Sequence, residues 1–207
     1  MYGSTTAARA EIRRLEALHH RIVGPGYAAR DPALSLWVHA TLIDATIAVN
    51  DAWLGPLDRG RRAAFYAETR PIGLAFGIPD TQLPADLEAF EAYVAGMLAP
   101  GGPVEVGPLA RDLAATILHP PLPGVLGPLP IPTGLYDWTL WPAIGLLPPR
   151  IREAYGFAWD ARHRLVARWL VAGWGAWRPW LPAGLRQMPQ ALAADRRLSV
   201  DRRLPGG

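Results

Sequence analysis

The chain has 207 residues, which suits one domain, and half of them are hydrophobic, which is enough for a real core. All 21 basic residues are arginine, the net charge is only +3, and no basic stripe with interleaved aromatic residues occurs, so nucleic-acid binding is disfavoured. The absence of cysteine excludes disulfides, thiolate metal sites and cysteine nucleophiles. A transition metal would therefore have to be held by histidine, carboxylate or a cofactor.

Helical periodicity dominates the chain, and we expect an all-α fold with a single domain of about eight helices. The first helix is expected over roughly residues 5–22, where VGPG ends it. Asp31 is a good N-cap for a second helix, with Pro32 at its first position. That helix runs to Trp53 and is apolar nearly all round, which is typical of a central, buried helix. Further helices are expected at about 58–76, 85–98 and 108–118.

The second half begins with a proline-rich stretch, HPPLPGVLGPLPIP, which cannot form a regular helix and is expected to be an ordered connector. Helices are then expected near 135–146, from LPPR to about residue 156, at about 159–177, and near Pro182. We expect the helical domain to cover residues 1–195 and the charged tail, residues 196–207, to be frayed.

The late segment RLVARWLVAGWGAWRPWL is the most apolar part of the second half and the candidate for contact with a membrane. Arg168 and Arg178 leave too short an apolar run for a transmembrane helix. Its Trp and Arg content would fit a helix that lies on a membrane surface, but a core helix with a Trp-rich face is favoured. We also expect most of the nine Trp residues to be buried or half-buried. Charges at Arg9, Glu11 and the residues after them argue against a signal peptide, so a cytoplasmic protein is expected.

Two adjacent histidines on the first helix are not equivalent. Ile12, Leu15, His19 and Ile22 recur at helical spacing on one apolar face, which directs His19 toward the core. His20 falls on a charged face and is expected to be solvated. Two interpretations of His19 remain open: a core histidine bonded to a carbonyl, or an axial haem ligand, since a neutral imidazole with dry walls suits haem iron.

The other histidines are expected to have structural roles. His39 shares a face of the second helix with Leu36 and Ile43 and is expected to join a buried polar network, with Asp44 and Asn50 as further polar groups on that helix. His119 is expected near the last carbonyls of a helix, and His163, between two arginines, is expected to be exposed. The chain has no HExxH, GxSxG, P-loop or GxGxxG motif.

The ordered motifs are similar to those of a bacterial enzyme family. They are LHHRIVGPGYAARDPALSLWVHATLIDATIAV, FYAETRPIGLAFGIPDTQLP, FEAYVAGML, ARDLAATILHPPLP, GLLPPRIREAYGFAWD and LPAGLRQMPQA. The set, from about Tyr2 to Ala194, resembles the family of latex-clearing protein (rubber oxygenase) and the MpaB oxygenase. The resemblance implies a helical haem b protein that uses O2 to cleave C=C bonds of isoprenoid or other apolar substrates.

The resemblance also implies site residues. The family's proximal iron ligand lies in an IHARV-like stretch that LHHRI matches, which makes His19 the implied haem and metal ligand. WVHATL matches a family motif with no ligand role, so His39 is expected to be structural or to lie behind the ligand. The family's distal Arg and Thr lie some tens of residues before the proximal histidine. Only 18 residues precede His19, so we expect that half of the pocket to be absent and assign no catalytic residue.

Three hypotheses follow. The first is a haem b-dependent oxygenase with His19 as ligand and Arg21, Arg13 or Arg14 near the propionates. The second is a cofactor-free helical domain that binds an apolar ligand or a partner chain. The third is a non-haem metal site that uses His19 and His39. The oligomeric state is left open.

Overall fold

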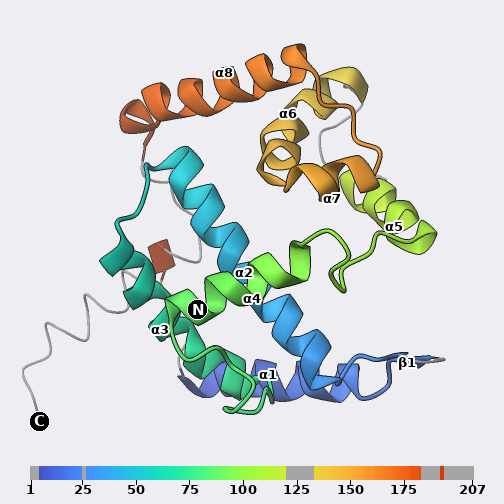
Figure 1. The fold of residues 1–207 in the computed structure, drawn as a ribbon. Helices are drawn as coiled ribbons and strands as arrows, with labels where there is room; N and C mark the ends of the chain where they lie inside the picture. Colours follow the sequence, from blue (N-terminus) through green and yellow to red (C-terminus); the bar gives the residue numbers. More distant parts are fainter. Residues whose placement is uncertain (1–4, 25–26, 120–132, 183–191, 194–207) are drawn as a thin grey trace, which may run out of the picture.

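The structure, a computed structural model, describes residues 5–24, 27–119, 133–182 and 192–193 (Figure 1). Within these ranges the chain is all-α, as predicted. The elements, in chain order, are α1 (Thr5–His19), β1 (Val23–Gly24), β2 (Tyr27–Ala28), α2 (Pro32–Trp53), α3 (Arg59–Ala75), α4 (Leu87–Leu98), α5 (Pro108–Leu118), α6 (Thr133–Leu146), α7 (Pro149–Ala154), α8 (Ala161–Trp177) and a 3-10 turn, η1 (Arg178–Trp180). The strands form one short antiparallel pair. The proline-rich connector after His119 and the whole charged tail lie outside the described residues, and so does the helix expected near Pro182 apart from Pro182 and residues 192–193.

Side-chain caps set the starts of four helices. Asp31, Asp58, Asp86 and Asp160 each accept a hydrogen bond from a backbone N–H of the first turn, at 2.8 to 3.1 Å. Each cap satisfies a donor that the helix itself leaves unpaired. This is why the predicted start of α2 agrees with the structure to the residue.

Helix α3 ends at a glycine with a left-handed backbone. Gly77 has a φ of +78°, a conformation that glycine adopts without steric cost. The N–H of Gly77 bonds to the carbonyl of Leu74, and the N–H of Ile78 bonds to the carbonyl of Gly73, as in a Schellman motif. Ile78 is thereby turned back into the core, where it is almost wholly buried.

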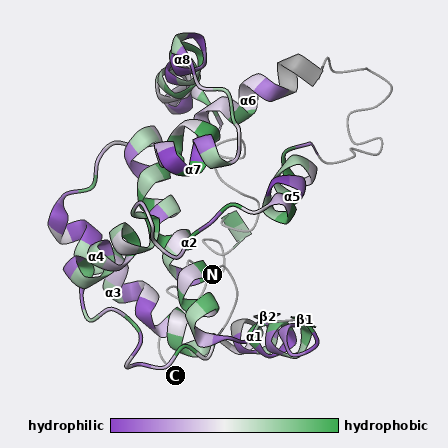
Figure 2. Ribbon diagram, turned by 45° about the vertical axis from the view of Figure 1, so that its right-hand side comes forward, coloured by the Kyte–Doolittle hydropathy of each residue, from purple (hydrophilic) through white to green (hydrophobic). Residues whose placement is uncertain are grey.

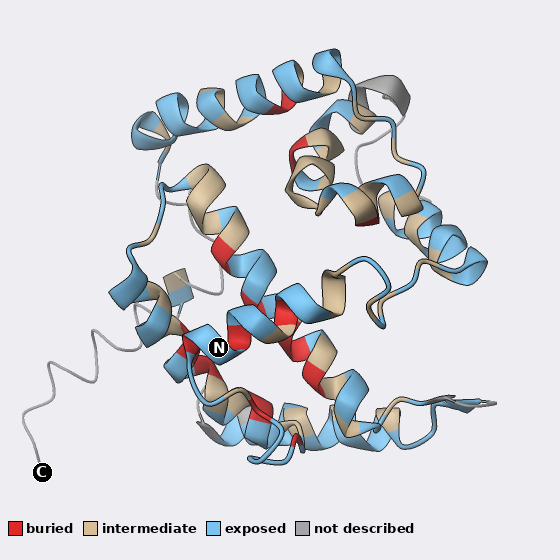
Figure 3. Ribbon diagram, viewed as in Figure 1, coloured by how far each residue is buried: buried red, intermediate tan, exposed pale blue. Residues whose placement is uncertain are grey.

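The core lies where α2, α3 and α4 cross, and Figure 3 shows most buried residues there. Its main cluster consists of Ala40, Ile43, Ile47, Tyr66, Leu87, Phe90 and Val94. The rings of Tyr66 and Phe90 pack with centroids 4.9 Å apart. On the far side of the molecule, α8 packs on α6 and on the end of α2, where Trp53 and Trp174 meet edge to face.

Helix α2 is central but not buried all round, so that part of the prediction is wrong. One face packs into the core, while Leu34, Val38, Leu42 and Val49 are exposed on another face. Hydrophobic periodicity could not separate these faces because both are apolar. Among the described residues, α2 alone has the length and composition that a membrane-crossing helix needs, features that a core helix shares.

Helix α8 is also more exposed than predicted. Ala167 is its only buried residue, so the expected core helix with a Trp-rich face is wrong. Of the nine Trp residues, four are half-buried and five are exposed, which corrects the expectation that most would be anchors. The exposed five are Trp138, Trp169, Trp174, Trp177 and Trp180.

Candidate functional site

An apolar groove with two histidines lies between the end of α1, the first half of α2 and the end of α3. Its volume is about 270 Å³. The lining residues are His19, Ala29, Leu34, Ser35, Val38, His39, Leu42, Ile72 and Phe76. The structure therefore brings together two histidines that are twenty positions apart in the sequence.

His19 is the last residue of α1, and its side chain is half-buried at the groove. Ile12 and Leu15 are half-buried on the same face, whereas His20 is exposed, as the helical spacing predicted. Ile22 is exposed because the helix ends before it, so its predicted place on this face is wrong. His19 lies at the edge of the groove and not deep in a core.

His39 is buried on α2 and its Nε2 atom has no hydrogen-bond partner among the described residues. The predicted buried network is wrong, because Asn50 donates instead to the carbonyl of Gly55 at 3.0 Å and Asp44 is exposed. Burial lowers the pKa of His39, because the charged imidazolium would lose its hydration. The side chain is therefore neutral at pH 7, which is the form that ligates metals.

The backbone of α3 approaches His39 closely at Gly73. A Cβ at this position would lie 3.0 Å from the His39 Nε2 atom and 3.0 Å from Leu83 Cδ2. A side chain at this position would crowd the imidazole, and glycine leaves the imidazole nitrogen against bare backbone. An unpaired buried nitrogen costs free energy, about 1–3 kcal/mol, so a site that retains one calls for an explanation.

The histidine groove offers imidazole nitrogens and apolar walls, and no carboxylate is among its lining residues. In the described ranges no group of three or more His, Asp or Glu residues could hold a metal, whereas protein zinc sites use at least three such ligands. Neutral imidazole beside apolar walls is the environment of an axial haem ligand. The groove volume of about 270 Å³ lies just below the range of pockets that enclose a whole ligand, so it would cover one part of a macrocycle.

The arginines proposed for the propionates are all on the surface. Arg13 and Arg21 are exposed, and Arg14 forms an ion pair with Glu11 at 2.6 Å. None of the three is among the residues that line the groove. Of the three, Arg21 is the nearest to His19 in sequence.

A second cavity, which the sequence did not indicate, lies between α2, α4, α6 and α7. Its volume is about 530 Å³, and its walls include Trp37, Ala45, Val49 and Leu146. Asp44 lines it too; its carboxylate remains accessible to solvent, while the surrounding apolar atoms raise its pKa by desolvation. The spacing of Thr41 and Asp44, one turn apart on α2, is the one sequence feature that could have indicated a polar patch on this face, and it was not used.

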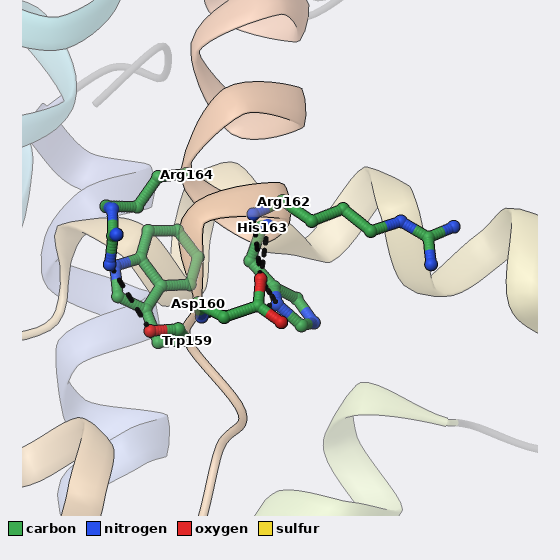
Figure 4. Close-up of polar contacts among 5 residues, drawn as sticks. All are labelled: Trp159, Asp160, Arg162, His163 and Arg164. Carbon is green, nitrogen blue, oxygen red and sulfur yellow. Dashed lines mark hydrogen bonds and ion pairs between the residues drawn. The ribbon is translucent and has the colours of Figure 1, made fainter.

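The remaining histidines make pairs with aspartates. His163 was expected to be exposed, but its side chain is largely buried and its Nδ1 lies 2.8 Å from Asp160 (Figure 4). The ring packs against Trp141, with centroids 4.5 Å apart. His119 caps α5 as predicted, and its Nε2 lies 2.8 Å from an oxygen of Asp137. These contacts join α5, α6 and α8.

Comparison with known proteins agrees with the motifs. Two mycobacterial proteins, both described as uncharacterized, from Mycobacterium tuberculosis and Mycobacterium bovis, are each 28% identical to this chain over 177 residues. The match covers 81% of this chain and 66% of each relative, so the chain spans slightly less than two thirds of their length. No solved structure matches significantly. A family model described as "ER-bound oxygenase mpaB/B'/Rubber oxygenase, catalytic domain" matches residues 1–176, and the chain belongs to this oxygenase family.

Proposed function

We propose that the groove binds haem b and that the chain is a haem-dependent oxygenase acting on an unsaturated apolar molecule. One observation carries the proposal: two imidazoles, one of them buried with an unpartnered nitrogen, line a single apolar groove. The haem, when bound, would supply the O2 chemistry, and the protein would supply binding, orientation and a dry environment.

Each part of the groove has a role in this proposal. His19 would ligate the iron, because it is less buried than His39 and lies at the end of a helix where its ring can turn toward a ligand. His39 would lie behind it, with its neutral imidazole forming part of the groove wall. Leu34, Val38 and Leu42 would exclude water from one face. Arg21 would pair with a propionate, by its charge and its nearness to His19 in sequence.

The substrate would be apolar. The exposed residues Leu34, Val38, Leu42 and Val49 follow α2 from the histidine groove to the second cavity, which Val49 also lines. An extended apolar molecule could cover this stripe and remove it from water, at about 25 cal/mol per Å² of apolar area. O2 would be the second substrate, as in the oxygenases for which the family is named.

The second cavity favours one other function, binding of an apolar ligand without a cofactor. Its volume of about 530 Å³ falls within the range of pockets that enclose a small molecule. Asp44 would accept a hydrogen bond from a hydroxyl group on such a ligand. The chain would then be a carrier or sensor, and its histidine groove would have no part in the function.

Oxygen uptake distinguishes the two functions. The protein is loaded with haem and given O2 and a short unsaturated isoprenoid, and carbonyl products are measured by mass spectrometry. We expect uptake of one O2 for every two carbonyl groups formed, since cleavage of one C=C bond places one oxygen atom on each carbon. The uptake should be lost in His19→Ala, while His20→Ala, an exposed neighbour, keeps it. Equal uptake in both variants, or none in the wild type, would refute the oxygenase proposal.

A further inference from the structure

The outward surface of α8 and η1 combines exposed Trp residues with arginines. We refer to Leu165 and Trp169 on α8, with Trp180 on η1, as the Trp surface. Trp169 and Trp180 are 72% and 85% exposed, far above what Trp residues show in a folded core. Trp177 lies about 80° round the helix from Trp169 and lines a cleft with Trp53 and Trp174, so it is not part of this surface. Figures 1 and 3 show α8 along one edge of the molecule, opposite α1, with most of its length exposed.

Helix geometry places the apolar and basic residues side by side. At about 100° per residue, Leu165, Trp169, Ala172 and Ala176 fall within one arc of α8, which at Ala172 borders the cleft between α8 and α6. Arg162 and Arg168 flank this arc on its two sides. Figure 4 shows Arg162 and Arg164 extending to opposite sides of the helix start, and Figure 2 shows that α8 has both hydrophilic and hydrophobic residues.

The charge on this surface has one sign. From Ala161 to Trp180 the chain has four arginines and no Asp or Glu. The nearest carboxylate, Asp160, is engaged in capping the helix and in its contact with His163. A surface of this composition attracts anions, and arginine and Trp together are typical of helices that lie at a lipid headgroup region.

The inner side of α8 also combines arginines with apolar residues. A cleft of about 650 Å³ lies between α8, α6, α7 and the end of α2. Its charged lining residues are Arg152, Arg164 and Arg168, and its other walls are mainly apolar. The guanidinium group of Arg152 stacks on the ring of Trp159, 4.7 Å from the ring centroid. Arg164 and Arg168, both on α8, thus flank an apolar cleft that has no carboxylate in its lining.

We propose that the Trp surface docks on a bilayer with anionic headgroups. The Trp side chains would lie at the boundary of headgroups and acyl chains, and the arginines would contact phosphate oxygens. The helix would lie flat on the membrane without crossing it. The proposal is independent of haem binding, since neither the groove nor its histidines take part.

Vesicle co-sedimentation of the whole protein, with and without haem, tests this. We expect binding to phosphatidylcholine vesicles that contain phosphatidylglycerol, and several-fold weaker binding to phosphatidylcholine alone. Trp169→Ala should weaken binding at least fivefold on both, and Arg168→Gln about fivefold on the anionic vesicles only. Higher salt should weaken the anionic preference, because the screening length falls from about 30 Å at 0.01 M to about 8 Å at 0.15 M.

Two exposed residues elsewhere serve as controls. Ile117→Ala on α5 removes an equally exposed apolar residue, and Arg30→Gln removes an exposed arginine. Both variants should bind like the wild type. The proposal fails if the wild type does not sediment with anionic vesicles, or if the control variants lose as much binding. It also fails if Trp169→Ala converts a dimer to a monomer in size-exclusion chromatography without changing vesicle binding. The Trp surface would then bind a second copy of the chain instead of a membrane.

Discussion

Replacing His39 by leucine should stabilise the cofactor-free protein. The two side chains are similar in volume, so the substitution keeps the packing of α2 against α3 and removes the polar atom. In the wild type that atom, Nε2, has no hydrogen-bond partner among the described residues, and the residue is only 9% exposed. Such a position would be costly to keep unless a ligand or another function required it.

The magnitude follows from the desolvation of one polar group. An unpaired buried group costs about 1–3 kcal/mol, and replacing it by apolar atoms of the same shape removes that cost. We allow about 1 kcal/mol for imperfect packing of leucine against Gly73 and Leu83, which lie close to the imidazole. The free energy of unfolding should rise by about 1 kcal/mol, and Tm by about 2–4 °C for a chain of this size.

Urea unfolding followed by circular dichroism measures this change. The midpoint should move to higher urea with an unchanged slope. The same variant should bind haem more weakly than the wild type, because the polar side chain that lowers stability at this position would be the one that haem binding needs. A His39→Leu protein that is less stable than the wild type by 1 kcal/mol or more would show that Nε2 is satisfied, and the reasoning would be wrong.

Three further predictions concern stability. Gly73→Ala should lower the free energy of unfolding by about 1 kcal/mol, because overpacking against His39 costs about 1–3 kcal/mol and outweighs a helix-propensity gain of about 1 kcal/mol. Gly96→Ala in α4 has open space around its Cβ, so in the same urea assay it should raise the free energy of unfolding by most of that helix-propensity gain. Asp86→Ala should lower the free energy of unfolding by about 1 kcal/mol, because it removes the N-cap hydrogen bond, and the loss should appear as a lower Tm. Glu88→Ala should change Tm little. Equal losses of Tm in the two variants would contradict the capping role of Asp86. Because burial lowers the pKa of His39, the unfolded chain binds a proton that the folded chain does not, so stability should fall as pH falls below about 6.5; a His39→Leu protein with the same pH dependence would exclude this cause.

The helix starts were predictable because their signals are local. Asp31 followed by Pro32, and Gly107 followed by Pro108, are the residues at which α2 and α5 begin. The Asp31 side chain caps α2 over two residues, and in both helices a proline stands at the first position, where no backbone donor is needed, so the sequence contains both signals. The half-buried face of α1, which includes His19, was predictable for the same reason.

Exposure was not predictable, because it depends on which element covers a face. The apolar faces of α2 and α8 look alike in the sequence whether or not another helix lies on them. His163 was misjudged because its arginine neighbours are visible in the sequence, while the Trp141 ring that covers it comes from α6, 22 positions away. The unpaired state of the His39 nitrogen depends on Gly73, on another helix, and no local pattern encodes it.

The most direct test of the histidine groove as the cofactor site is a haem titration followed by visible absorption. Wild type and His20→Ala should bind one haem per chain with the same Soret band and affinity. His19→Ala should shift the band and bind at least tenfold more weakly, which corresponds to the loss of about 1.4 kcal/mol or more from one iron–imidazole contact. If His19→Ala gives the same spectrum and affinity as His20→Ala, His19 does not ligate the iron and the proposed site is wrong.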